Sequence, residues 1–226
     1  MTRLTALLLD LDGRLLDTAP EMAAALNILR DEEHLAPLPF HLIRPTVSHG
    51  STGMLNLGFG GVTAMEFERL RVRFLDIYRA KLGSNTRLFD GFDAVLEHVS
   101  QNGLAWGVVT NKPGWLTDPL LQMMHITPTN ACIVSGDTVG ERKPHPLPLL
   151  HAAGLISREP AQCLYVGDAE RDITAGRAAG MTTVVAGWGY LGSTDDPASW
   201  RADGLVAEPI GLVPWLHPNQ PRVATS

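Results

Sequence analysis

Two aspartates, Asp10 and Asp12, stand two residues apart at the end of the apolar run in LLLDLDGRLLDT, residues 7–18. In an extended chain, side chains two residues apart face the same side. Carboxylates this close disfavour each other's ionised form, so a cation should lie between them or one of them should react. Facing one phosphorus atom, one could attack as the nucleophile while the other handles the proton on the leaving oxygen. The pair therefore suits phosphoryl-transfer chemistry if the substrate is a phosphate monoester.

Other polar side chains follow other apolar runs of the sequence. Thr110 and Asn111 end one run, Lys143 lies in SGDTVGERKPHP, and Asp168 and Asp172 lie in GDAERDI. Carboxylate oxygens suit Mg²⁺, which also binds substrate phosphate. The hydroxyl of Thr110 and the ammonium group of Lys143 could neutralise and orient the phosphoryl oxygens. We therefore expect a Mg²⁺ ion and a phosphate monoester at one site.

Five nearly continuous apolar runs are the elements that must position these groups. Such runs are typical of strands buried on both faces of a parallel sheet. The predicted strands are Leu4–Asp10, Leu104–Thr110, Ala131–Ser135, Cys163–Val166 and Thr182–Ala186. The predicted helices between them are Phe92–Gln101, Trp115–Met124, Leu147–Ala153 and Asp172–Ala179. This alternation predicts a doubly wound, Rossmann-like α/β domain, with the ligand beyond the carboxyl ends of the strands.

A helical insert is expected between the first two strands. TAPEMAAALNILRDEE has the spacing of a capping box, with Thr18 at the N-cap and Glu21 three residues later. TAMEFERLRVRFLDIYRAKL, residues 63–82, repeats apolar residues at helical spacing. We expect residues 1–17 and 88–213 to form the core domain and residues 18–87 a small helical domain. Residues 214–226 are Pro-rich and polar, and are expected to be loose.

Composition excludes several classes of protein. The chain has 226 residues, a net charge of −6 and no basic stripe, which argues against a nucleic-acid partner. It has no apolar stretch long enough to cross a membrane. The N-terminal segment lacks a signal-peptide cleavage pattern, so we expect a cytoplasmic protein, a monomer or weak dimer. Cys132 and Cys163 lie in apolar stretches and are expected to be buried thiols.

The four polar segments resemble the four motifs of the haloacid dehalogenase-like phosphatases, in family order and over nearly the whole chain. DLDGRLLDT resembles the first motif, VVTNK the second, Lys143 in ERKPHP the third and GDAERD the fourth. The resemblance implies Asp10 as nucleophile and Asp12 as general acid/base. It implies Mg²⁺ held by Asp10, the backbone carbonyl of Asp12 and Asp168, with Asp172 in support. The helical insert is similar to the family's cap, which closes over the site and selects the substrate.

Two subfamilies compete for the substrate. DTAPE and the general layout resemble bacterial phosphoglycolate phosphatases. LAWGVVTNKP, RDITAGRAAG and WGYLGSTDDPASWRADG are more similar to the N-acetylmuramic acid 6-phosphate phosphatases of cell-wall recycling, which we favour. A sugar phosphomutase would share the aspartyl-phosphate step. A phospho-acceptor receiver domain would be about half this length and would lack the insert.

Arg14 departs from the family, which usually has threonine at this position. A cation there could assist phosphate binding, obstruct the hinge of the cap, or leave a phosphate-binding protein without turnover. Because position 14 follows the tight turn at Gly13, its backbone N–H is expected to matter more than its side chain. Lys112 is expected to face solvent. The residues expected to bind substrate are Gly13 and Asn111 in the core and Arg44 and Ser48 in the insert.

Overall fold

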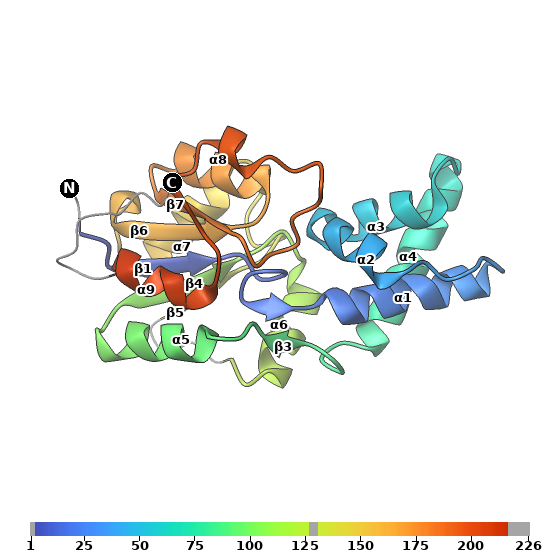
Figure 1. The fold of residues 1–226 in the computed structure, drawn as a ribbon, viewed down its shortest axis with the longest axis horizontal. Coiled ribbons are helices and arrows are strands. Elements are labelled where there is room, and N and C mark those ends of the chain that lie inside the picture. The colour runs from blue at the N-terminus through green and yellow to red at the C-terminus, as the bar shows by residue number, and fades with distance from the viewer. Residues whose placement is uncertain (1–2, 127–130, 217–226) are drawn as a thin grey trace.

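The computed structural model describes residues 3–126 and 131–216. Within these residues, a sheet of six parallel strands has the order β5-β4-β1-β6-β7-β8 (Figure 1). Its strands are β1 (Ala6–Leu9), β4 (Ala105–Val109), β5 (Ala131–Val134), β6 (Cys163–Gly167), β7 (Thr182–Ala186) and β8 (Gly204–Val206). The predicted doubly wound α/β fold is confirmed. All five expected strands are present, and β8 is an addition that the sequence pattern did not reveal.

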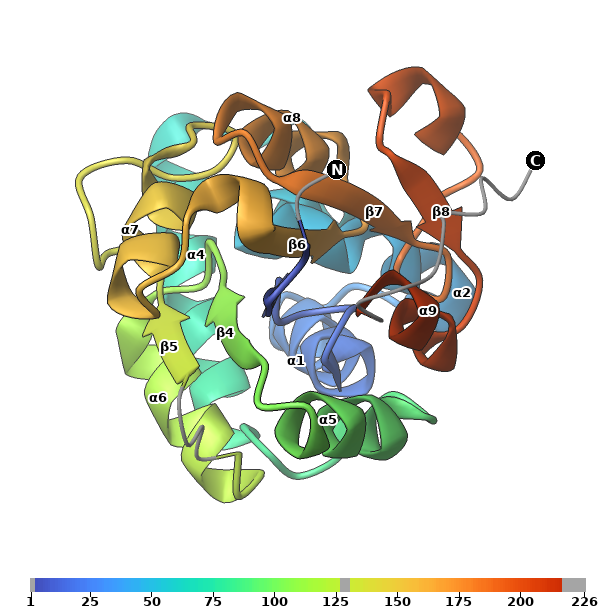
Figure 2. The same cartoon turned by 90° about the vertical axis from the view of Figure 1, so that its left-hand side faces the viewer.

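Helices cover both faces of the sheet, which explains the continuous apolar runs. Leu7 and Leu9 of β1 face one core cluster, whereas Ala6 and Leu8 face the other. Figure 2 shows α7 and α8 on one side of the sheet and α5 and α6 on the opposite side. These helices are α5 (Phe92–Gln101), α6 (Gly114–Met123), α7 (Leu147–Leu155) and α8 (Glu170–Ala178).

A group of helices lies beyond the carboxyl ends of the strands (Figure 1). It consists of α1 (Ala19–Glu32), α2 (Phe40–Ile43), the 3-10 helix η1 (Arg44–His49), α3 (Gly50–Phe59) and α4 (Ala64–Ala80). Leu26 and Phe74 are among the fully buried side chains that hold α1 and α4 together. Thr63 accepts a hydrogen bond from the backbone N–H of Glu66 and so caps α4.

The capping box expected at the start of α1 is wrong. Thr18 precedes the helix, but its side chain makes no capping hydrogen bond. Its hydroxyl donates to Asp12 instead, at 2.6 Å. The Glu21 carboxylate accepts from the backbone N–H groups of Gly83, Asn85 and Thr86, far along the chain. Both side chains therefore serve tertiary contacts that a local pattern cannot show.

Short elements complete the fold. β2 (Leu16–Asp17) and β3 (Arg87–Leu88) form a small antiparallel pair at the two crossings between the helical group and the sheet domain. The remaining elements are η2 (Pro160–Gln162), η3 (Pro197–Trp200), η4 (Pro209–Leu212) and α9 (Val213–Leu216). Of the segment expected to be loose, residues 214–216 end α9, and residues 217–226 lie outside the described residues.

Candidate active site

Three buried carboxylates meet where β1 and β6 end. Asp10 directly follows β1, Asp168 follows β6, and Asp172 lies in the first turn of α8. Because β1 and β6 are parallel neighbours, their carboxyl ends lie side by side and bring these residues together. The tight turn after Asp12 depends on Gly13, whose φ is +85°. A Cβ at this position would lie 2.6 Å from Oδ2 of Asp168, so Gly13 packs against the acidic cluster.

Arg14 lies at the centre of these carboxylates. Its Nη2 is 2.5 Å from Oδ2 of Asp10, 2.8 Å from Oδ1 of Asp168 and 2.6 Å from Oδ2 of Asp172. Its Nη1 donates to the backbone carbonyl of Asp12. The side chain is fully buried. Burial opposes the charged form, but the three carboxylates hold the pKa of Arg14 well above its ordinary value. The guanidinium is therefore a fixed charge inside the cluster.

Lys143 is the second buried cation of the cluster. Its Nζ lies 3.1 Å from Asp10 and 2.8 Å from Asp172, and donates to the hydroxyl of Tyr165 at 2.7 Å. Burial opposes ionisation of Asp172, yet Lys143 and Arg14 together lower the pKa of Asp172. Burial dominates at Asp168, whose pKa is raised although Arg14 acts against it. The neighbours of Asp172 therefore favour its ionised form, whereas burial of Asp168 favours its protonated form.

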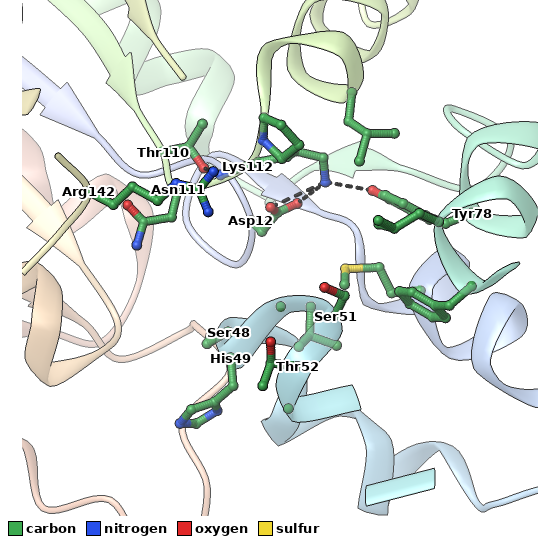
Figure 3. Close-up of a pocket in the computed structure, with 18 of the residues that line it drawn as sticks. Asp12, Ser48, His49, Ser51, Thr52, Tyr78, Thr110, Asn111, Lys112 and Arg142 are labelled. Carbon is green, nitrogen blue, oxygen red and sulfur yellow. Dashed lines mark hydrogen bonds and ion pairs between the residues drawn. The ribbon is translucent and has the colours of Figure 1, made fainter. Parts of the chain in front are cut away.

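The expectation that Lys112 faces solvent is wrong. Lys112 contacts Asp12, the second aspartate of the first motif. Its Nζ lies 3.0 Å from Oδ1 of Asp12 and 2.7 Å from the hydroxyl of Tyr78 in α4 (Figure 3). Burial raises the pKa of Asp12, but Lys112 and the Thr18 hydroxyl outweigh it and lower that pKa. Lys112 turns inward because Tyr78 and Asp12 offer it an acceptor from each side.

A cavity of about 810 Å³ opens between the strand ends and the helical group. In Figure 3, Thr110 and Asn111 line the core side, while Ser48, Ser51 and Thr52 line the opposite side. Asn111 is held by two hydrogen bonds with the backbone of Lys143, at 2.9 and 3.0 Å. The remaining lining residues are Asp10, Asp12, Arg14, Met22, Val47, His49, Gly50, Gly53, Asn56, Arg71, Phe74, Leu75, Tyr78, Lys112, Pro113, Trp115, Leu116, Asp137, Arg142 and Arg171.

The two expected contacts from the insert have different positions. Ser48 lines the cavity, and its hydroxyl lies 2.9 and 3.0 Å from the two carboxylate oxygens of Asp168. Arg44 is not among the lining residues of this cavity. It donates to the backbone carbonyls of Trp188 and Gly189, both at 3.1 Å, and stacks over the ring of Tyr190. In this arrangement Arg44 attaches the helical group to the sheet domain.

The acidic cluster does not fit the expected Mg²⁺ ion. The oxygens that would hold it belong to Asp10, Asp12 and Asp168, and all three residues contact Arg14. Within residues 3–126 and 131–216, no group of three or more His, Cys, Asp and Glu side chains is arranged to hold a metal ion. The cation that these oxygens surround is a guanidinium.

The expected residues of the sheet domain gather at one edge, and three neighbours were missed. Asp10, Asp12, Thr110, Asn111, Lys143, Asp168 and Asp172 lie together there. Tyr78, Tyr165 and the inward position of Lys112 were not predicted. Lys112 carries a usable signal, because it lies three residues after the end of β4 and two residues after Thr110. The tyrosines lie within a helix and a strand, where aromatic residues ordinarily indicate core packing.

A six-stranded parallel sheet with carboxylates at its carboxyl edge, and a helical group beyond that edge, defines a Rossmann-like α/β domain with a helical insertion. The chain belongs to the haloacid dehalogenase-like hydrolases, whose family model matches residues 7–186. It is a phosphoric monoester hydrolase of this family. Within the described residues, no helix is long and apolar enough to span a membrane.

Relatives cover nearly the whole chain. A phosphoglycolate phosphatase of Xanthomonas campestris pv. campestris (strain 8004) is 48% identical over 92% of this chain and 94% of its own length. An N-acetylmuramic acid 6-phosphate phosphatase of Pseudomonas aeruginosa is 38% identical, over 93% and 94%. The crystal structure of a predicted phosphoglycolate phosphatase from Haemophilus somnus 129PT matches with a TM-score of 0.81 at 25% identity, over 94% and 98%.

Proposed function

We propose that this chain hydrolyses N-acetylmuramic acid 6-phosphate through a phosphorylated Asp10. The observation that carries the proposal is the position of Asp10 and Asp12 at the wall of a cavity of about 810 Å³. A cavity of this volume has room for an amino sugar beyond the phosphate group. Ser51 and Thr52 of α3 offer hydroxyl groups on the side away from the carboxylates, suited to a sugar, whereas the Ser48 hydroxyl contacts Asp168.

In this proposal Asp10 is oriented before it reacts. Its Oδ1 accepts a hydrogen bond of 2.7 Å from the backbone N–H of Leu11, and its Oδ2 contacts Lys143 and Arg14. Attack by Asp10 forms a bond from carboxylate oxygen to phosphorus and breaks the phosphorus–oxygen bond of the ester. Asp12 is ionised in the free site because its pKa is lowered, so the proton for the departing alkoxide enters with the monoanionic ester and passes through Asp12. Asp12 then removes a proton from the water that attacks phosphorus, which frees inorganic phosphate and restores Asp10.

Residues 18–87 act as the cap in this proposal, and residues 1–17 and 88–213 form the catalytic core. Contacts between the helical group and the core include those of Tyr78 with Lys112, Ser48 with Asp168 and Arg44 with Gly189. Asn111 and Thr110 line the core side of the cavity, where they can contact the phosphate group. Closure of the cap excludes water from the ester while Asp10 attacks.

The test is release of inorganic phosphate from N-acetylmuramic acid 6-phosphate by the purified chain, with Asp10→Asn compared. We expect release by the wild type and loss of at least a thousandfold in the variant, since asparagine lacks the attacking oxygen. Asp90→Asn, at an exposed residue outside the cavity, is the matched control and should keep full activity. Equal rates in wild type and Asp10→Asn would refute the role of Asp10.

Phosphoglycolate is the second candidate substrate. It is favoured by the relative named phosphoglycolate phosphatase, which is 48% identical to this chain. The two esters are compared by kcat/KM in one assay, because that ratio measures discrimination between substrates. A higher kcat/KM for phosphoglycolate would replace the sugar phosphate as the substrate while leaving the chemistry at Asp10 unchanged.

A further inference from the structure

Arg14 occupies the position where the family resemblance implies a divalent cation. The implied ligands are a carboxylate oxygen of Asp10, the backbone carbonyl of Asp12 and a carboxylate oxygen of Asp168. The terminal nitrogens of Arg14 contact all three, and Asp172 as well. One guanidinium therefore uses the oxygens that would form the protein part of a Mg²⁺ coordination shell.

The two cations cannot share this place. Mg²⁺ binds oxygen at about 2.0–2.1 Å in near-octahedral geometry and needs the oxygens directed at one point. Nη2 of Arg14 stands at that point, 2.5–2.8 Å from oxygens of Asp10, Asp168 and Asp172. A metal ion among the same oxygens would overlap the guanidinium and repel it.

Arg14 is also held in this position by its main chain. Gly13 makes the turn that directs it inward, and the indole of Trp188 donates to the Arg14 carbonyl at 3.1 Å. The side chain is fully buried, so moving outward would separate it from three carboxylates at once. Breaking a buried ion pair leaves uncompensated charges, so the inward position of the Arg14 side chain is strongly favoured.

The charge supplied by Arg14 differs from that of a metal ion. Among the described residues, the cluster combines the carboxylates of Asp10, Asp12, Asp168 and Asp172 with Arg14, Lys112 and Lys143. A dication in place of Arg14 would supply one more positive charge at the point where these carboxylates meet. The guanidinium satisfies the carboxylates but attracts an incoming phosphate less strongly.

We propose that Arg14 is the resident cation of this site, and that the chain handles its phosphate ester without a divalent metal ion. This inference goes beyond the proposed substrate and holds for any phosphate ester. The first motif then supplies its own positive charge through the guanidinium of Arg14. It also implies that a single substitution at position 14 restores a divalent-cation site.

The experiment is a titration of full-length protein with Mn²⁺, followed by electron paramagnetic resonance of the free ion. Mn²⁺ is used because it prefers the same oxygen ligands as Mg²⁺. The wild type is compared with Arg14→Thr, which introduces the residue usual in the family, and with Arg177→Thr. Arg177 is an exposed arginine of α8, so its replacement changes the net charge equally without touching the cluster.

We expect Arg14→Thr to bind one Mn²⁺ per chain at least a hundredfold more tightly than the wild type and Arg177→Thr. Adding Asp168→Asn to Arg14→Thr should abolish that binding, since it removes a ligand. Equal affinity in wild type and Arg14→Thr, or no binding by either, would overturn the proposal. The titration contains no substrate, so its result does not depend on which ester is hydrolysed.

A second measurement covers the case in which Arg14→Thr does not fold. Mg²⁺ that binds the native state raises the melting temperature, whereas an ion that does not bind leaves it unchanged. We expect no rise for the wild type across a Mg²⁺ series, and phosphate release that is insensitive to a chelator. A saturable rise in the wild type, with loss of phosphate release on chelation, would show that Arg14 does not replace the metal.

Discussion

At the scale of single residues, the site is a set of charged groups, some of whose contacts come from distant parts of the chain. Asp12 shows this most directly, because Lys112 approaches it from a segment 100 residues along the chain, while Thr18 and the guanidinium of Arg14 come from its own stretch of chain. The net lowering of its pKa is therefore a product of tertiary structure. A folded-state pKa below the unfolded one contributes stability above the unfolded value, and this contribution is lost as pH falls.

Lys112→Met tests that linkage. Near neutral pH we expect the free energy of unfolding to fall by about 3 kcal/mol, because Asp12 loses its buried partner. The ordinary pKa of this group is 3.8 and the folded value is lower, so the deficit should shrink as pH falls below about 4. Urea denaturation at several pH values measures it, with Lys81→Met as the control. A deficit that stays constant down to the lowest pH would contradict the coupling.

The carboxylates themselves were predictable from the sequence, because each follows an apolar run in a parallel α/β pattern. The contacts of Lys112 and Arg14 were not, since each depends on partners from distant segments. Lys112 required Tyr78, 34 residues earlier, and Arg14 required Asp172, 158 residues later. A spacing pattern identifies groups at the end of one strand, but it does not identify which cation lies among them.

At the scale of elements, the strands and helices of the sheet domain follow from hydrophobic pattern. Helix α5 has the bounds expected from sequence, Phe92–Gln101, because a polar face and a glycine after its end define it locally. Strand β8 has three residues and an exposed leucine at its centre, so its apolar signal is weak. Helix α1 began close to its expected position, but its predicted capping box failed because Glu21 binds a distant loop.

Glu21→Gln tests how firmly that loop is attached to α1. The buried carboxylate accepts three backbone hydrogen bonds, at 3.1, 2.6 and 2.7 Å. An amide replaces one acceptor oxygen with a donor, so we expect a loss of about 2 kcal/mol in the free energy of unfolding. Glu97→Gln, at an exposed position of α5, should change it by less than about 0.5 kcal/mol. Equal values for both variants in chemical denaturation would exclude this anchoring role.

At the scale of the whole molecule, the helical group and the sheet domain are joined by two short crossings and by contacts at the site. The strands β2 and β3 pair where the chain leaves and returns. Arg44 adds a contact away from the cavity, on the carbonyls of residues 188 and 189 and the ring of Tyr190. The position of the helical group over the sheet domain therefore depends partly on Arg44, which does not line the cavity.

Arg44→Ala should weaken the attachment of the helical group to the sheet domain without changing the contacts of Asp10 or Asp12. We expect hydrogen exchange of backbone amides in η1 to accelerate by about tenfold, which corresponds to roughly 1.4 kcal/mol, while amides of β6 keep their rates. Arg177→Ala serves as the control for loss of one exposed arginine. Unchanged exchange in η1 would show that the cation contact with Tyr190 does not hold this segment.

The guanidinium beside Asp10 is covalently part of the same chain, and this determines where the positive charge of the site comes from. A bound ion belongs to the surrounding solution, which can deplete it, exchange it for a competitor or sequester it with a chelator. A side chain four residues from Asp10 is delivered by translation, in a fixed ratio of one to one. The positive charge among these carboxylates is thus inherited with the gene rather than drawn from the medium.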